Sequence, residues 1–227
     1  MGQSFVNPQI LKTVPLFSSL ADDQLALLQP CLQQRSYSRS AFVLRSGEET
    51  DALYIILSGR VKILMTDEHG REVILAVLGQ NEFFGEMGLF DEQPRSASVE
   101  AMEACQMLRL SKAGFMNCLE NNFGLAMVVI RNLVRRLRQA DRNIESLALI
   151  DVYGRVARLL LDQAEEIDGQ WIVKQAPPKQ EMARMIGASR EMVSRVVKDL
   201  QQRGYIRAEK RRVYLIDKIS MTKRAGS

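Results

Sequence analysis

A long stretch without proline or glycine, from Leu125 to Val152, is the feature that most constrains how this chain folds. Within it, apolar residues recur at alternating spacings of four and three over three heptads, which is typical of a coiled-coil helix. The members of this seam are Ala126, Ile130, Leu133, Leu137, Ala140, Ile144 and Leu147. Because charged residues flank the narrow seam, we predict that two identical chains dimerise along it, rather than that the helix is buried in its own domain.

The region before this helix has the period of β-strands. Between Phe42 and about Leu110, short runs rich in β-branched and apolar residues alternate with glycine-containing turns. Such even spacing predicts an antiparallel sandwich or barrel, whose packed faces can enclose a ligand. Residues 5–35, in contrast, are predicted to be helical, with helix start signals from Ser19 to Asp23.

Beyond the long helix the pattern is mixed. We expect a helix over 156–164, a turn at 168–169 and a short strand over 171–173. Pro177-Pro178 then begins a short amphipathic helix that ends at Ile186.

Two short helices joined by a glycine-containing turn form the strongest local motif of this region. Gly187 permits the tight turn, and Ser189 is placed to cap a second helix over 190–202. Five residues of that helix are expected to face inward: Met192, Val193, Val196, Val197 and Leu200. Two strands, 205–207 and 213–216, are predicted to flank a basic hairpin, or wing.

The distribution of charge supports a polyanionic partner for this region. Residues 1–150 hold 15 basic and 17 acidic residues, whereas residues 171–227 hold 14 basic and 5 acidic residues. In the major groove an arginine can donate two hydrogen bonds to guanine, and a glutamate can accept one from cytosine. The residues predicted to contact DNA are Lys179, Gln180, Ser189, Arg190, Glu191, Ser194, Arg195, Lys198, Lys210 and Arg211.

A second motif lies between predicted strands, where Phe84-Gly85-Glu86-Met87-Gly88-Leu89-Phe90 is followed by Arg95-Ser96-Ala97. Glycines let a backbone approach a ligand closely, and an arginine with a serine can bind a phosphate. An ionised Glu86 can accept a hydrogen bond from a ribose hydroxyl. On these residues alone, a phosphate pocket and ordinary surface turns remain alternatives.

Composition argues against several classes of protein. Cys31, Cys105 and Cys118 are widely spaced and odd in number, so we expect no disulfide framework, no zinc site and a reducing, cytoplasmic location. The only histidine, His69, lies in a predicted turn, which argues against a catalytic triad or a histidine-bound metal. Because no run approaches the roughly 18–20 apolar residues of a membrane-spanning helix, no membrane partner is expected. We therefore predict no catalytic residues and no metal ligands.

In order and spacing, three segments resemble the cyclic-AMP receptor branch of the Crp/Fnr superfamily of transcription regulators. They are the motif at 84–97, the helix end at 147–155 and the helix-turn-helix at 187–200, within a likeness that covers about residues 14–216. The resemblance implies an α+β fold in three parts: a cyclic-nucleotide-binding β-roll (jelly roll) over 1–121, a coiled-coil dimerisation helix over 122–151, and a winged helix-turn-helix domain over 152–227.

The resemblance also implies roles for individual residues. Glu86 would hold the ribose 2′-hydroxyl, and Arg95 and Ser96 would hold the cyclic phosphate. The full set expected at the ligand is Gly85, Glu86, Met87, Arg95, Ser96, Ala97, Arg136, Ala140 and Asp141. Members that respond to cyclic AMP carry neighbouring Thr and Ser where this chain has Ala140-Asp141, so the half of the pocket that senses the base is altered.

The effector therefore has three candidates: cyclic AMP, which is narrowly favoured, another nucleotide such as cyclic di-GMP, or none. For cyclic di-GMP, the arginines at 135, 136 and 138 would suit a second phosphate. No tightly bound cofactor is expected.

The expected function is that of a homodimeric, sequence-specific transcription regulator. Because Arg190, Glu191 and Arg195 match the family's base-reading positions, the expected DNA is a palindrome with TGTGA-like half-sites, and RNA polymerase is an expected partner. An enzyme that acts on nucleotides is a rival, but it would have only Glu86 as a base. A dimer that merely sequesters nucleotide is a second rival, which would not need the basic helix and wing.

Overall fold

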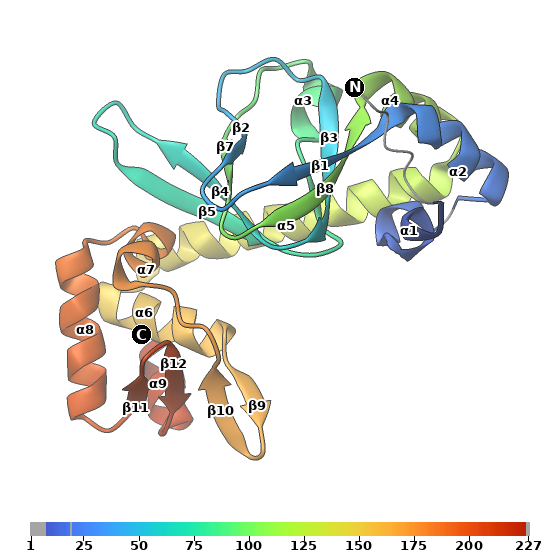
Figure 1. The fold of residues 1–227 in the computed structure, drawn as a ribbon. Helices are drawn as coiled ribbons and strands as arrows, with labels where there is room; N and C mark the ends of the chain where they lie inside the picture. The colour runs from blue at the N-terminus through green and yellow to red at the C-terminus, as the bar shows by residue number, and fades with distance from the viewer. Residues whose placement is uncertain (1–7, 19, 226–227) are drawn as a thin grey trace. The chain divides into compact units, whose positions relative to one another are not determined.

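The computed structural model describes residues 8–18 and 20–225. The chain divides into two compact units, Met1–Arg136 and Leu137–Ser227. Figure 1 shows the order of the helices and strands within each unit. The domain limits predicted from the sequence lie instead at the ends of the long helix, and they stay a prediction.

The first unit begins with short helical segments, which are α1 (Pro8–Thr13), η1 (Pro15–Phe17), α2 (Asp22–Leu28) and η2 (Gln29–Cys31). The predicted helix over 5–35 is wrong at its end, because strand β1 (Leu32–Tyr37) follows directly. This strand pairs with β8 (Cys105–Ser111), so that Leu32 lies opposite Leu110. This segment is a strand because it pairs with β8, which lies some 70 residues further along the chain. Local periodicity does not reveal such a distant partner. Residues 5–7 and Ser19, the first of the predicted start signals, lie outside the described part.

Two antiparallel four-stranded sheets form a β-roll, which confirms the predicted all-β region. Their strand orders are β1-β8-β3-β6 and β2-β7-β4-β5. The further strands are β2 (Phe42–Leu44), β3 (Ala52–Ser58), β4 (Val61–Thr66), β5 (Glu72–Leu78), β6 (Phe83–Phe84) and β7 (Ser98–Ala101).

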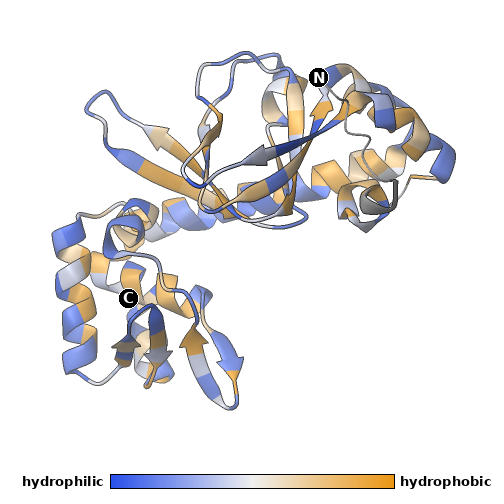
Figure 2. Ribbon diagram, viewed as in Figure 1, coloured by the Kyte–Doolittle hydropathy of each residue, from blue (hydrophilic) through white to orange (hydrophobic). Residues whose placement is uncertain are grey.

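Strand β3 shows why the runs were continuously apolar. Leu53 and Ile55 belong to a core shared with the helices, whereas Tyr54 and Ile56 belong to the core inside the roll. A strand that is buried on both faces carries apolar residues at successive positions, without alternation. Figure 2 shows β3 mostly in the orange of apolar residues. Two short helices complete the unit, α3 (Met87–Asp91) and α4 (Lys112–Glu120).

The predicted long helix is α5 (Phe123–Leu149). Leu125 and Val129, near its start, are buried in the core shared with the helices. Further along, large apolar side chains of the seam are exposed, with Leu137 at 62% and Ile144 at 66%. An exposed apolar stripe on a polar helix is the surface expected of a coiled-coil contact.

The second unit packs helices against a four-stranded sheet of order β11-β12-β10-β9. Its elements are α6 (Val152–Asp162), β9 (Glu165–Ile167), β10 (Gln170–Val173), α7 (Lys179–Ile186), α8 (Arg190–Gln202), β11 (Ile206–Glu209), β12 (Arg212–Leu215) and α9 (Lys218–Ala225). No helix within residues 8–18 and 20–225 is both long and apolar enough to span a membrane.

Three sequence-based details of this unit are corrected. Helix α6 begins at Val152 rather than Val156, because the Asp151 side chain accepts a hydrogen bond from the Gly154 amide (2.7 Å) and caps it. Strand β9 and helix α9 were not foreseen, since neither carries a strong apolar period. Met192 is 42% exposed and does not face inward, whereas the other four residues predicted to face inward are buried.

Candidate ligand cavity and nucleic-acid interface

A cavity in the β-roll brings together most of the residues predicted to bind a ligand. Its lining comprises Leu44, Ile63, Phe84, Gly85, Glu86, Met87, Gly88, Arg95, Ser96, Ala97, Val99 and Arg136. The space inside, part of which is open to solvent, is about 430 Å³. Ala140 and Asp141 are not among the lining residues, and both are exposed on α5.

Gly85 is the residue that allows the wall of this cavity to form. Its φ of +83° lies in the left-handed region, which side-chain-bearing residues rarely adopt. A Cβ atom at this position would lie 2.7 Å from Nη1 of Arg95. The glycine therefore permits both the turn after β6 and the close approach of the arginine.

Arg95 is buried, with 5% of its surface exposed. Its Nη1 donates to the Gly85 carbonyl (2.7 Å), and its Nη2 donates to the Ala52 carbonyl (2.8 Å). The Nε atom is buried without a partner. Burial lowers the pKa of Arg95 from its ordinary value, and the nearby Tyr54 and Asp51 oppose this shift. The guanidinium is thus fixed by carbonyls, with a donor left unused.

Among the charged residues that the structure describes, Glu86 is the most deeply buried, with 1% exposed. Its Oε1 accepts a hydrogen bond from Nη1 of Arg136 at 2.6 Å, while its Oε2 has no partner. Arg136 also donates to the Phe83 carbonyl, and its guanidinium carbon lies 5.6 Å from the centre of the Phe83 ring. A buried ion pair of this kind is costly to break by removing one partner.

The ion pair between Glu86 and Arg136 was not foreseen from the sequence. The sequence placed Arg136 near a second phosphate, and the structure pairs it with a carboxylate instead. One signal was present, because Arg136 adjoins the seam without belonging to it and so points to another side of the helix.

The lining has the chemistry of a site for a partly apolar anion. Its acidic and basic side chains are Glu86, Arg95 and Arg136, whose formal charges sum to one positive charge. Leu44, Ile63 and other apolar residues supply the remaining walls. Among the described residues, no cluster of histidine, cysteine or carboxylate side chains is suited to hold a metal ion.

The helix-turn-helix is formed by α7 and α8 as predicted. Gly187 ends α7 in the left-handed conformation, with φ of +61°. The Ser189 hydroxyl caps α8 by accepting a hydrogen bond from the Met192 amide (3.2 Å). Hydrogen bonds from its own backbone amide and from Ser189 hold the pKa of Glu191 below its usual value, so that this carboxylate is ionised.

The outward face of α8 offers charges to solvent. Arg190, Glu191, Arg195 and Lys198 are exposed, and Ser194 is half-buried. In the part of the chain that the structure describes, Arg195 and Lys198 make no ion pair, whereas Arg203 is paired with Asp199 at 2.7 Å. At the start of α7, Lys179 and Gln180 are also exposed.

The predicted wing is the hairpin of β11 and β12. Glu209 pairs with Arg212, so that Lys210 and Arg211 form the turn. Lys210 adopts a positive φ of 55°, and the Arg211 carbonyl accepts a hydrogen bond from the Ala176 amide at 2.8 Å. The turn thus presents two basic residues on an anchored backbone.

The comparisons with known proteins agree with this arrangement. A family model of the cyclic nucleotide-binding domain matches residues 34–122, and a model of the Crp-like helix-turn-helix domain matches residues 154–222. A CRP-like cAMP-activated global transcriptional regulator of Mycobacterium tuberculosis is 32% identical over 221 residues, which cover 96% of this chain and 99% of that protein. The chain belongs to the Crp/Fnr family.

Further Crp/Fnr relatives extend the comparison. The cAMP-activated regulator Vfr of Pseudomonas aeruginosa is 36% identical over 79% of this chain and 87% of its own length. The structure of the c-di-GMP responsive regulator CLP of Xanthomonas campestris matches with a TM-score of 0.72 and 28% identity, over 86% of this chain and 99% of that one. Crp/Fnr proteins are DNA-binding transcription regulators rather than enzymes, which confirms the predicted class of function. The cyclic nucleotide-binding domain match and the cAMP-activated relatives support a cyclic nucleotide as the effector.

Proposed function

We propose that this chain is a homodimeric, sequence-specific DNA-binding regulator whose DNA affinity is raised by cyclic AMP bound in the β-roll cavity. The observation that carries the proposal is the cavity itself. Three of its lining residues each have a buried polar atom without a partner, namely Oε2 of Glu86, Nε of Arg95 and Nε of Arg136, and apolar residues form the other walls. Buried polar groups without partners are costly, so a ligand that pairs with such atoms would be favoured.

The roles of the cavity residues follow from these atoms. Oε2 of Glu86 accepts a hydrogen bond from the ribose 2′-hydroxyl, and Nε of Arg95 donates to the cyclic phosphate. The exposed Ser96 contributes a hydroxyl to the same phosphate. Gly85, Met87 and Ala97 line the site, while contacts from Ala140 and Asp141 to the base remain a prediction.

Charge favours a cyclic mononucleotide over cyclic di-GMP. The single net positive charge of the lining balances one phosphodiester, whereas cyclic di-GMP carries two. Two of the three arginines suggested for a second phosphate already have carboxylate partners, because Arg136 pairs with Glu86 within the lining and Arg135 pairs with Glu82 at 3.0 Å. The cAMP-activated relatives support the same choice.

Cyclic di-GMP is the second candidate because of the likeness to the CLP regulator. Isothermal titration calorimetry with cyclic AMP, cyclic GMP and cyclic di-GMP separates the candidates. We expect heat from cyclic AMP with one site per chain. Heat from cyclic di-GMP alone would favour the second candidate, and heat from none would leave a regulator without a nucleotide effector.

Dimerisation and DNA recognition complete the proposal. The exposed seam of α5 pairs with its copy in the partner subunit, and α8 enters the major groove of each half-site. Such half-sites lie about 34 Å apart. Arg190, Glu191 and Arg195 read bases of a TGTGA-like sequence, and Lys179, Gln180, Ser189, Ser194, Lys198, Lys210 and Arg211 contact the backbone or neighbouring bases. RNA polymerase is the expected partner on promoter DNA.

The nucleotide acts by binding one dimer state more tightly than another. A palindromic TGTGA probe, titrated with and without cyclic AMP, tests this directly. We expect tighter binding in the presence of the nucleotide, and equal binding in both would contradict the regulatory part of the proposal.

A further inference from the structure

We propose that Asp51 is a positioning residue for ligand binding, which acts by holding Arg95 in the orientation that the nucleotide phosphate requires. The inference rests on the proposed function, in which Arg95 binds the phosphate. Asp51 is not among the residues that line the cavity, so its positioning effect on the ligand passes through Arg95.

The ion pairs around Asp51 join two arginines. Its Oδ1 lies 3.5 Å from Nη2 of Arg95, and its Oδ2 is hydrogen-bonded to Nη2 of Arg109 on β8. The Asp51 carbonyl accepts a hydrogen bond from the Lys112 amide at 2.9 Å, which fixes the backbone at the start of α4. Asp51 is thus held at both its backbone and its side chain, although 62% of the side chain is exposed.

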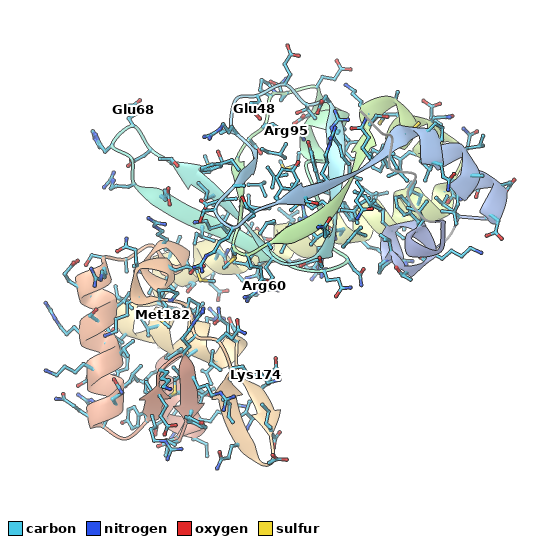
Figure 3. All side chains as sticks on the ribbon, in the orientation of Figure 1. Glu48, Arg60, Glu68, Arg95, Lys174 and Met182 are labelled. Atoms are coloured by element: carbon cyan, nitrogen blue, oxygen red, sulfur yellow. The ribbon has the colours of Figure 1, made fainter. Side chains whose placement is uncertain are left out.

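Asp51 supplies something that the carbonyl partners of Arg95 do not. The carbonyls of Gly85 and Ala52 each accept one hydrogen bond, and neither carries a full charge. Besides Asp51, the Glu48 carboxylate also raises the pKa of Arg95. Glu48 contacts the Arg95 backbone, since its carbonyl accepts from the Arg95 amide at 2.8 Å, and Figure 3 shows the two labelled residues near each other. Asp51 is therefore the carboxylate that pairs with the guanidinium itself.

Two effects of Asp51 on an anionic ligand have opposite signs. As a negative charge near the site, Asp51 repels a phosphate, so its neutralisation should tighten binding. As a positioning group, it holds the Arg95 guanidinium in the orientation that binds the phosphate, so its neutralisation should weaken binding. The direction of the change on substitution separates the two effects.

The test is cyclic AMP binding to the full-length protein with the substitution Asp51→Asn, which removes the charge and keeps the shape. We expect affinity to fall about tenfold, as for the loss of one charge-assisted contact. Glu92→Gln is the matched control, because this substitution also removes one negative charge from the same unit. Glu92 forms its ion pair with Lys112 rather than with Arg95. Asp51→Glu restores the charge and should recover most of the affinity.

Adenosine binding distinguishes a positioning role of Asp51 from a general structural role, which would weaken the binding of both ligands. Adenosine has the base and the ribose but no phosphate, so its binding, measured by competition, should be equal in the Asp51→Asn variant and the unchanged protein. Equal weakening of adenosine and cyclic AMP, or binding of cyclic AMP that is unchanged or tighter, overturns the inference. If the Asp51→Asn variant does not fold, Arg109→Gln replaces it, because it releases the second oxygen of Asp51 and should weaken cyclic AMP binding in the same way.

The two proposals fail in different ways. No binding of cyclic AMP by the unchanged protein would overturn the proposed function and this inference with it. Binding that is lost in Arg95→Ala but unaffected in Asp51→Asn would overturn the inference alone.

Discussion

The charged residues of the proposed sites in the two units differ in their exposure to solvent and in their partners. In the β-roll, Glu86 and Arg95 are nearly inaccessible to solvent, and each is fixed by a partner. In the winged helix-turn-helix unit, Arg195 and Lys198 point to solvent without an ion pair among the described residues. Charges fixed in a buried site favour one small ligand of matching shape, whereas exposed charges suit a long polyanion whose counterions they displace.

Salt gives the largest expected difference between the two sites. Raising the salt concentration from 50 to 200 mM should weaken DNA binding by roughly a thousandfold, because the phosphate contacts release counterions. Cyclic AMP binding should change by less than about threefold, since buried pairs are screened much less than exposed ones. Fluorescence anisotropy measures how the affinity for DNA depends on salt concentration, and calorimetry measures the same dependence for the nucleotide. Equal slopes would remove the contrast between the sites.

Substitution of the buried arginine should give the next largest effect. Arg95→Ala removes the charge proposed to bind the phosphate, and nucleotide affinity should fall by about a hundredfold. Binding to non-specific DNA should not change, because Arg95 belongs to the other unit. Nucleotide-dependent DNA binding that survives in this variant would refute the role of Arg95.

On α8, the contrast is between a base-reading residue and a phosphate-binding one. Arg195→Ala should cost roughly 1–3 kcal/mol and relax discrimination at one base pair. Lys198→Ala should weaken all sequences about equally and lower the salt slope by about 1. A panel of single-base variants of the TGTGA half-site, titrated at two salt concentrations, measures both. Uniform weakening by Arg195→Ala would argue against base readout.

The smallest expected effect concerns stability. Ser189→Ala removes the cap of α8, and it should lower the free energy of unfolding of the second unit by about 1 kcal/mol. Denaturant unfolding, followed by the fluorescence of Trp171 in that unit, reports this change. Nucleotide binding in the β-roll should be unaffected. A loss of nucleotide affinity would mean that the cap matters beyond its own unit.

Local signals made much of this molecule predictable. The heptads of α5, the strand and glycine pattern of the β-roll, and the turn from Gly187 to Ser189 are all specified by neighbouring residues. The resemblance to the Crp/Fnr family added the residues that the cavity brings together, from Gly85 to Ala97.

Contacts between distant residues explain what was missed. The sequence did not reveal that Arg136 pairs with Glu86, which lies 50 residues earlier, or that Asp51 joins Arg95 to Arg109. Strand β1 was taken as helix for the same reason, because its partner β8 lies far along the chain. Periodicity reports the face that a residue occupies, but it does not report which distant group that face will meet.

The account as a whole depends on nucleotide-controlled recognition of a palindrome by a dimer. The most direct measurement is an anisotropy titration of a labelled TGTGA palindrome and a scrambled duplex, each with and without saturating cyclic AMP. The account predicts that cyclic AMP tightens binding to the palindrome by at least about tenfold, at two chains per duplex, with far less effect on the scrambled DNA. Equal affinity for both duplexes, unchanged by the nucleotide, would contradict it.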